Sequence, residues 1–445
     1  MGPMACWYRR VFLLAIPLIF SNLTQPLLST VDTVLSGHLP GPAALGGVAV
    51  GGIFFNTVYW TFGFLRMTTT GLVAQAHGAR RHDQLRLHFL RALASAAVIG
   101  ALVLALQTPI IAIAVRVLGA SDAVAQNARL YCHIRIWSAP AALANYVLLG
   151  YLLGRQRART ALVLQAAVNV VNVAVALLLV LRLHWGVAGV AAATVTADWA
   201  GCLLGLLLAR SVVHREPGEG RTGWHELLDG PSLRHLFALN RDIFLRTLSL
   251  VAAYAWFTRT GARAGDATLA ANAVLMNMFF IVAYGLDGFA NATEALVGES
   301  IGAHKLDHYR AVLRASTVSA FMVAGLASLV YLLAGSHLVG LFTNVEPVRT
   351  LAVRFLPWII ALPVVSVWGF QLDGIFIGAT RGRELRDSMV ISFVLFLSLA
   401  IALERVLGNH GLWCAFSAWM VMRGITLAMR LPRVERLFAD PAPVC

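Results

Sequence analysis

Charged side chains are scarce in this sequence. Only 13% of its 445 residues are Asp, Glu, Lys or Arg, whereas 59% are hydrophobic. A soluble domain usually carries about 25% charged residues, because its surface faces water. Apolar stretches of about 20 residues, enough to cross a bilayer core of ~30 Å as a helix, recur along the whole chain. The composition therefore excludes a soluble globular protein and predicts an all-α membrane protein.

Cysteines and clustered metal ligands are also scarce. The five cysteines are scattered, without the spacing of a disulfide framework or a metal site: Cys6, Cys132, Cys202, Cys414 and Cys445. The predicted spans hold no His, Asp and Glu cluster with metal-ligand spacing and no nucleophile motif. We therefore expect neither an enzyme nor a bound metal or organic cofactor. No A-x-A cleavage pattern follows the first apolar run, so we expect a retained first helix rather than a signal peptide.

Acidic residues are fewer than basic ones: the sequence has 21 Asp and Glu but 35 Lys and Arg. Such an excess in a soluble protein would suggest nucleic acid, but here the charges lie in short segments between apolar runs. The connections assigned to one side carry 25 Lys and Arg, among them Arg246 and Arg423, and the other side carries 8. Because cytoplasmic loops retain positive charge, we expect no nucleic-acid partner, an even number of spans and cytoplasmic termini. The expected location is an inner (plasma) membrane that the chain crosses several times.

Apolar windows between charges and Gly or Pro breaks predict twelve transmembrane helices. The predicted ranges are 11–37, 47–75, 92–116, 126–154, 160–181, 186–210, 239–262, 269–299, 311–335, 346–378, 387–404 and 410–430. They predict a first lobe over residues 1–210, a polar cytoplasmic linker over 211–238, and a second lobe with a short cytoplasmic tail over 239–445.

The two halves repeat each other at a constant separation along the chain. The segment 78–86, with the sequence GARRHDQLR, resembles GAHKLDHYR at 302–310. The separation between these two segments, here called the repeat spacing, also relates glycines of the two halves: Gly150 to Gly374, and Gly154 to Gly378. Because both matched segments are assigned to the cytoplasm, six helices separate equivalent points. This arrangement predicts two pseudo-symmetric six-helix lobes related by an axis along the membrane normal, as in some transporters, and we expect a monomer.

Several predicted spans carry polar residues, although a central Asp costs about 2.5–3.5 kcal/mol to insert. In the first helix they share one face: Asn22, Gln25, Ser29 and Asp32. Pro17 and Pro26 interrupt the same helix, and each removes a backbone hydrogen bond, so both are candidate hinges. Polar residues elsewhere are Gln165, Asn169, Asn172, Thr194, Asp198, Tyr284, Asp287, Asn291, Glu294, Gln371 and Asp373.

These polar groups have two interpretations that the sequence leaves open. They either fix helix packing through interhelical hydrogen bonds or form an ion or substrate site. The functional interpretation is favoured for Asp32. For Arg66 and Arg135, which also lie within predicted spans, we expect snorkelling or an internal ion pair.

Four segments resemble the MATE family of multidrug and toxic-compound exporters, in particular its DinF-type branch: residues 16–39, 137–145, 284–298 and 372–380. The resemblance implies twelve helices in two lobes, and export of amphipathic, often cationic compounds against inward proton or sodium flow. It also implies an ion site in the first lobe at Asp32, Asn172 and Thr194, which Asn169 and Asp198 would extend. In the second lobe we expect a polar or substrate site at Tyr284, Asp287, Asn291, Glu294 and Asp373.

One departure from the family pattern bears on the coupling ion. Many relatives carry a second acid at the position that is Ala176 here. Its loss weakens a sodium site, which favours several oxygen ligands including charged ones, so protonation of Asp32 that bends the first helix is the simpler chemistry. The expected partners are small-molecule substrates and membrane lipids. Apolar candidates for substrate contact are Phe54, Tyr59, Trp60, Trp256, Met276, Met278 and Trp368.

Two rival functions remain within this architecture. One is a sodium-coupled exporter, and the other is a flippase of lipid-linked precursors. A flippase would need a basic central cavity to hold pyrophosphate, whereas the charges assigned to the spans are mostly acidic. A third rival, an integral-membrane enzyme, lacks any supporting motif.

Overall fold

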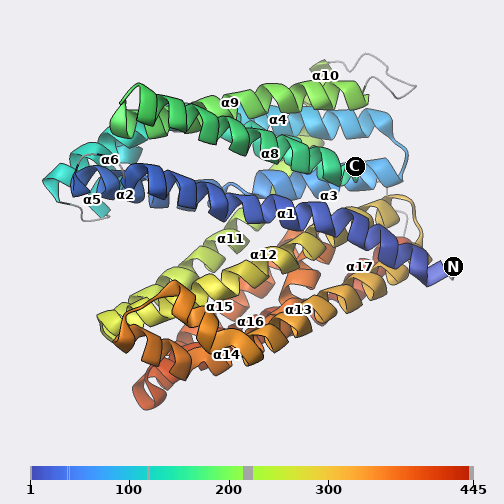
Figure 1. The fold of residues 1–445 in the computed structure, drawn as a ribbon. Coiled ribbons are helices and arrows are strands. Elements are labelled where there is room, and N and C mark those ends of the chain that lie inside the picture. Colours follow the sequence, from blue (N-terminus) through green and yellow to red (C-terminus); the bar gives the residue numbers. More distant parts are fainter. Residues whose placement is uncertain (1–2, 38, 40, 118–120, 214–223, 440–445) are drawn as a thin grey trace. The chain divides into compact units, whose positions relative to one another are not determined.

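The computed structural model describes residues 3–37, 39, 41–117, 121–213 and 224–439, and every regular element among them is helical (Figure 1). The first half contains α1 (Pro3–Gly37), α2 (Pro42–Thr61), α3 (Phe64–Gly78), α4 (His82–Ala105), α5 (Gln107–Val117), α6 (Asp122–Arg135), η1 (Ile136–Ser138), α7 (Ala139–Gly154), α8 (Ala158–Ala176), the π-helix η2 (Leu177–Arg182) and α9 (Gly186–Val213). The second half contains α10 (Trp224–Leu227), α11 (Gly230–Arg263), α12 (Asp266–Gly302), α13 (Leu306–Phe342), α14 (Glu346–Gly378), α15 (Gly382–Leu407), α16 (Asn409–Ala428) and α17 (Leu431–Ala439).

These elements confirm the twelve predicted spans. Several of the first six predicted spans correspond to two helices in sequence, such as α2 with α3 and α6 with α7, and one ends in the π-helix η2. Eleven segments of the described residues are long and apolar enough to cross a membrane by length and composition. The remaining span is α11, whose 34 residues include several arginines that lower its hydropathy.

The chain divides into two compact units, each described by itself. The first unit is Leu23–Arg234, and the second unit combines Met1–Asn22 with His235–Cys445. Helix α1 therefore contributes its first part to the second unit, where Arg10 donates two hydrogen bonds of 2.8 and 2.7 Å to the Glu299 carboxylate. In the same unit α12, α13 and α14 pack alongside one another (Figure 1). The predicted lobe limits, drawn from sequence alone, stay a prediction.

Helix α11 begins earlier than the hydropathy predicts. It starts at Gly230 and not at 239, because local capping rather than hydropathy sets its start. The Asp229 carboxylate accepts a hydrogen bond of 3.0 Å from the Ser232 backbone N–H, and Pro231 lies in the first turn. Hydrogen bonding to Ser232 holds the pKa of Asp229 below its usual value. Residues 214–223 of the predicted linker lie outside the described residues.

The backbone confirms the internal repeat. Arg80 and His304, which are separated by the repeat spacing, both have a positive φ, 55° and 53°. Gln156 and Thr380 form a second pair at the same spacing, with φ of 59° and 54°. Left-handed residues of this kind end helices. The chain thus turns in the same unusual conformation at equivalent points of both halves.

Equivalent glycines allow equivalent helix contacts. A methyl group added at Gly150 would overlap the carbonyl oxygen of Arg66, and one at Gly374 would overlap the carbonyl oxygen of Ala290. Arg66 and Ala290 are themselves separated by the repeat spacing. Small residues that bring backbones together are typical of helix packing in membranes. The repeat therefore preserves the α3–α7 contact as the α12–α14 contact.

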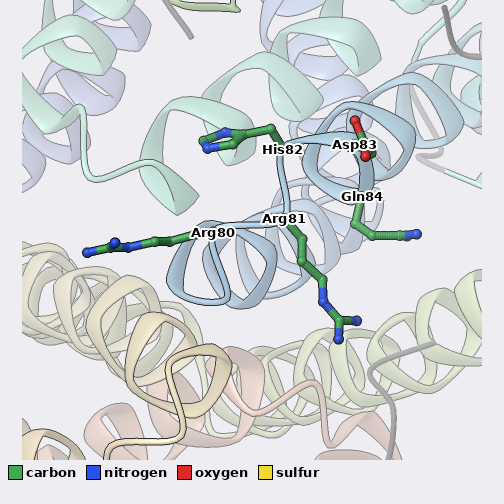
Figure 2. Close-up of a pocket in the computed structure, with 5 residues that line it drawn as sticks. All are labelled: Arg80, Arg81, His82, Asp83 and Gln84. Carbon is green, nitrogen blue, oxygen red and sulfur yellow. The ribbon is translucent and has the colours of Figure 1, made fainter. Parts of the chain in front are cut away.

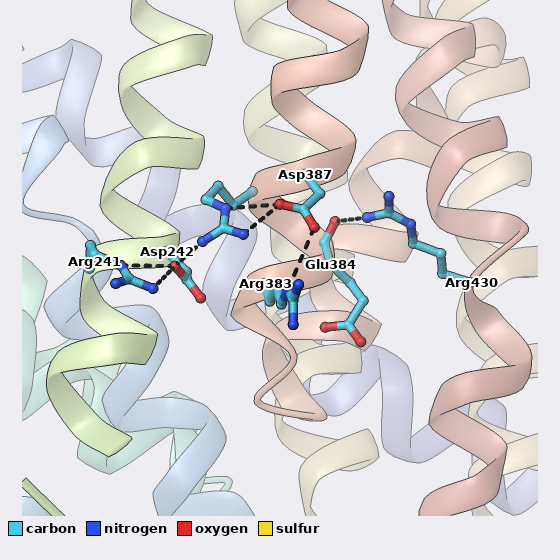
Figure 3. A network of polar contacts seen from close by, with 7 residues as sticks. Arg241, Asp242, Arg383, Glu384, Asp387 and Arg430 are labelled. Atoms are coloured by element: carbon cyan, nitrogen blue, oxygen red, sulfur yellow. Dashed lines mark hydrogen bonds and ion pairs between the residues drawn. The ribbon is translucent and has the colours of Figure 1, made fainter. Parts of the chain in front are cut away.

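An ionic network joins α11 to α15 in the second unit (Figure 3). Asp242, whose side chain is 10% exposed, accepts hydrogen bonds from Arg386 at 2.7 Å and from Arg241 at 3.0 Å. Arg386 also contacts Asp387 at 2.7 Å. Arg430, which lies between α16 and α17, extends the network by donating to the carbonyl oxygen of Glu384 at 2.8 Å.

Candidate functional site

The structure brings together two residues of the predicted ion site in the first unit. Asn172 of α8 is 1% exposed, and its Nδ2 donates a hydrogen bond of 3.1 Å to Oγ1 of Thr194 on α9. The Thr194 hydroxyl donates in turn to the carbonyl oxygen of Val190. The Oδ1 atom of Asn172 is buried and accepts no hydrogen bond from any described residue. A buried acceptor of this kind is suited to a bound cation or a protonated acid.

Asp32, the third member of this predicted site, belongs to α1, but its side chain lies outside the described residues. The backbone nevertheless places its segment. Val31 and Leu35, on either side of it, pack against an apolar cluster that includes Ala176 of α8 and Ala193 of α9. Ala176 follows Asn172 by one helical turn, and Ala193 precedes Thr194. The α1 segment that carries Asp32 therefore adjoins the Asn172–Thr194 pair.

The predicted hinges lie within an unbroken helix in this structure, since α1 runs from Pro3 to Gly37 through both prolines. Pro17 is half-buried. The side chain of Pro26, like those of Gln25 and Ser29, lies outside the described residues. Bending at either position stays a prediction.

Asp198 belongs to a polar cluster that the sequence does not reveal. Ser138 and Arg135 both lie within electrostatic range of its carboxyl. The Ser138 hydroxyl is also 3.2 Å from the Tyr59 hydroxyl. Arg135, which is half-buried, donates a hydrogen bond to the Tyr131 hydroxyl one turn earlier on α6. Because Asp198 follows Thr194 by one turn of α9, the cluster borders the Asn172–Thr194 pair.

Asn169 takes part in a local contact only. Its Oδ1 lies 3.5 Å from the Nε2 of Gln165, one turn earlier on α8. Its own Nδ2 is buried and donates to no described residue.

Asp373 of α14 is paired with two arginines from other helices. Its Oδ2 accepts hydrogen bonds from Arg246 of α11 and, at 2.6 Å, from Arg423 of α16. The three side chains are 3–8% exposed. Arg246 and Arg423, which the charge count assigns to the cytoplasmic side, are therefore buried partners of Asp373, and their side of the membrane stays a prediction. One feature of the sequence could have indicated this burial, because both arginines lie about two turns inside predicted spans.

The other predicted residues of the second unit lie on α12. Tyr284, Asp287 and Asn291 are half-buried, whereas Glu294 is 1% exposed. The carbonyl oxygen of Tyr284 accepts a hydrogen bond of 3.2 Å from Asn22 of α1. These residues line α12 over three turns, and the pairing of Asp373 with its two arginines involves none of them.

Tyr254 of α11 lies near both the α12 residues and the arginines of Asp373. It lies within range of Asp287 and Tyr284 on one hand and of Arg246 and Arg423 on the other. Gln371, two residues before Asp373, accepts a hydrogen bond of 3.0 Å from Thr293.

The apolar candidates divide by exposure. Tyr59, Met276 and Met278 are at most 9% exposed and contribute to packing. Trp60 and Trp368 are 43% and 48% exposed. Phe54 and Trp256 are intermediate.

A hollow of about 500 Å³ lies at the α3–α4 connection, lined by Arg80, Arg81, His82, Asp83 and Gln84. Figure 2 shows that these side chains spread in different directions instead of converging. A ligand site needs a few convergent polar groups, so this hollow is not a candidate. Among the described residues, no three His, Cys, Asp or Glu side chains group as metal ligands.

Comparison with known proteins agrees with this architecture. The MatE family profile matches residues 17–178 and 243–405. The DNA damage-inducible protein F of Escherichia coli K12 is 45% identical over 418 residues, which cover 93% of this chain and 90% of that protein. The probable multidrug resistance protein NorM of Acinetobacter baylyi is 24% identical and covers 97% of both chains. A crystal structure of MATE in the straight conformation superposes with a TM-score of 0.86 at 19% identity, covering 98% of this chain and 97% of that one.

Proposed function

Because the chain belongs to the MATE family of membrane transporters, we propose that it exports amphipathic, often cationic small molecules in exchange for protons. The chain is a transporter and not an enzyme, because the relatives that it matches are transporters. In the proposed cycle, Asp32 takes up a proton from the outer side, α1 bends at Pro17 or Pro26, and the substrate is released outward. Loss of the proton to the cytoplasm resets the site.

The observation that carries this proposal is the buried Asn172–Thr194 pair beside the α1 segment of Asp32. The pair offers the unpartnered Oδ1 of Asn172 to whatever binds there. A neutral carboxyl costs far less to bury than an ionised one. Protonation of Asp32 would therefore change how deeply its segment of α1 can pack against α8 and α9. Asp198, one turn from Thr194, would adjust the electrostatic field of this site.

The choice of the proton over sodium rests on the surroundings of Ala176. This side chain is 0% exposed and lies in an apolar cluster with Leu35 and Ala193. A sodium ion needs several oxygen ligands, and charged ones favour it. The position from which many relatives would supply a second acid instead provides a methyl group.

Proteoliposomes that contain the purified protein and ethidium distinguish the coupling ions. We expect ethidium transport to follow an imposed pH gradient and to ignore a sodium gradient of equal size at constant pH. A membrane potential contributes about 2.3 kcal/mol per charge per 100 mV, so it is clamped with potassium and valinomycin. Transport that follows sodium alone would overturn the proton assignment and leave the exporter assignment standing.

The location and assembly are proposed in the same terms. We expect the chain in the bacterial inner membrane as a monomer, with both termini in the cytoplasm. It would act on small molecules within a lipid environment and would need no cofactor besides the coupling ion.

A further inference from the structure

We propose that Arg246 and Arg423 form a binding site for the anionic group of an amphipathic substrate. The inference rests on the proposed export function and extends its substrates from cationic to anionic amphipathic molecules. The ligand chemistry is a carboxylate, sulfonate or phosphate attached to an apolar body.

Charge is the first argument. Two guanidinium groups share one carboxylate, Asp373, so the three side chains together carry a net positive charge. All three are nearly buried, at 3–8% exposure. An uncompensated charge in such a position is costly, and a second negative group binding there would remove the cost.

Hydrogen bonding is the second argument. The Nε atoms of Arg246 and Arg423 are buried and donate to no described residue. The indole N–H of Trp419, whose ring centroid is 5.8 Å from the Arg423 guanidinium carbon, is also buried and has no described acceptor. All three of these unpaired groups are donors. Buried donors without acceptors are uncommon, and an anion with several acceptor oxygens satisfies more than one of them.

Aromatic surroundings are the third argument. The guanidinium carbon of Arg423 lies 5.7 Å from the ring centroid of Phe370 and 5.8 Å from that of Trp419. Tyr254 packs on Trp419 with the ring centroids 5.8 Å apart. Tyr254 and Tyr284 are themselves half-buried. Aromatic rings beside a guanidinium pair suit a molecule with an apolar body and an anionic end.

A matched pair of probes tests this assignment at equilibrium, without any ion gradient. The probes are 11-(dansylamino)undecanoate, which ends in a carboxylate, and its methyl ester, which lacks the charge. Binding to the full-length protein in neutral-lipid nanodiscs is followed by energy transfer from tryptophan to dansyl. We expect wild-type protein to bind the carboxylate at least tenfold more tightly than the ester, as for a charged hydrogen bond.

Substitution then assigns the preference to the two arginines. We expect Arg246→Gln and Arg423→Gln each to weaken carboxylate binding about tenfold and to leave ester binding unchanged. Unchanged ester binding also shows that the variants are folded. Arg423→Lys should retain part of the preference, and Arg383→Gln, which removes an arginine whose side chain is 80% exposed, should retain all of it. Equal binding of both probes by wild type, or equal loss of both in the variants, would overturn the proposal.

The lipid composition of the nanodiscs distinguishes two sources of the anion, a lipid headgroup and a free amphiphile. If nanodiscs of anionic phosphatidylglycerol abolish carboxylate binding that neutral lipid permits, the site takes a lipid headgroup. If they do not, it takes the free amphiphile. Both results retain the anion site. Because these measurements need no coupling ion, their failure is distinguishable from a failure of proton-driven ethidium transport.

Discussion

At the scale of single residues, two buried polar groups join side chains from different helices. Asn172 with Thr194 joins α8 to α9, and Asp373 with its arginines joins α11, α14 and α16. The Asn172–Thr194 pair leaves an acceptor without a hydrogen bond, whereas the two arginines of Asp373 leave donors without one. The two units therefore differ in the sign of the ligand that their buried groups are suited to bind.

Thr194→Ala tests the first pair. Thr194 and Thr196 both donate a hydrogen bond to the carbonyl oxygen one turn earlier, but only Thr194 also accepts from Asn172. Loss of one hydrogen bond costs about 0.5–1.5 kcal/mol. We therefore expect Thr194→Ala to slow pH-driven ethidium transport about two- to tenfold. Thr196→Ala, on an exposed side chain, should transport like wild type, and equal rates for both variants would argue against the site.

Asp242→Ala tests the ionic network. The acid is nearly buried and has two arginine partners, so its removal leaves Arg386 with one carboxylate partner fewer. We expect a destabilisation of up to about 3 kcal/mol, seen as a lower thermal unfolding midpoint in detergent. Arg383→Ala removes an exposed pair at 3.9 Å and should cost less than about 1 kcal/mol. A midpoint unchanged in Asp242→Ala would show that the network contributes nothing to stability.

At the scale of helices, the repeat is carried by close backbone contacts and not by the polar residues. The glycines of the two halves coincide at the repeat spacing, and so do the left-handed turns. At the same spacing, however, Asp32 corresponds to Trp256 and Asp373 to Leu149. The two halves thus share a scaffold and have separate chemistry.

Gly374→Ala tests this scaffold. The added methyl group would meet the backbone of α12 at Ala290, which cannot move aside as a side chain can. We expect a loss of about 1–3 kcal/mol, as for other overpacked sites, and a lower unfolding midpoint. Gly325→Ala is the matched control, because nothing lies within 4 Å of its methyl position in α13. There we expect no loss, since alanine favours a helix more than glycine by about 0.5–1 kcal/mol. Equal unfolding midpoints for the two variants would show that the close contact between Gly374 and Ala290 does not contribute to stability.

Sequence was sufficient for the helices because membrane spans leave a strong hydropathy signal. It also located Asn172 and Thr194, which the structure joins. It missed the partners of Asp373, because Arg246 is 127 residues away and Arg423 is 50 residues away along the chain. Both lie near predicted cytoplasmic ends, where positive charge already has an explanation in topology. Only the packing of three helices distinguishes a buried arginine from a topological one.

At the scale of the whole molecule, an even number of spans places both termini on one side of the membrane. Removing Arg246 and Arg423 from the charge count still leaves a large excess on the side assigned to the cytoplasm. We expect a green fluorescent protein fused after Cys445 to fluoresce, because it matures in the cytoplasm. Alkaline phosphatase fused at the same point should be inactive. An active phosphatase fusion would reverse the assigned orientation.

The central claim is that the charge of Asp32 couples proton movement to transport. It is tested most directly by Asp32→Asn in proteoliposomes, with ethidium movement measured in two modes. The account predicts that the variant loses transport driven by a pH gradient but still exchanges labelled for unlabelled ethidium at equal pH, because the substrate path remains. Wild-type rates of pH-driven transport in the Asp32→Asn variant would contradict it.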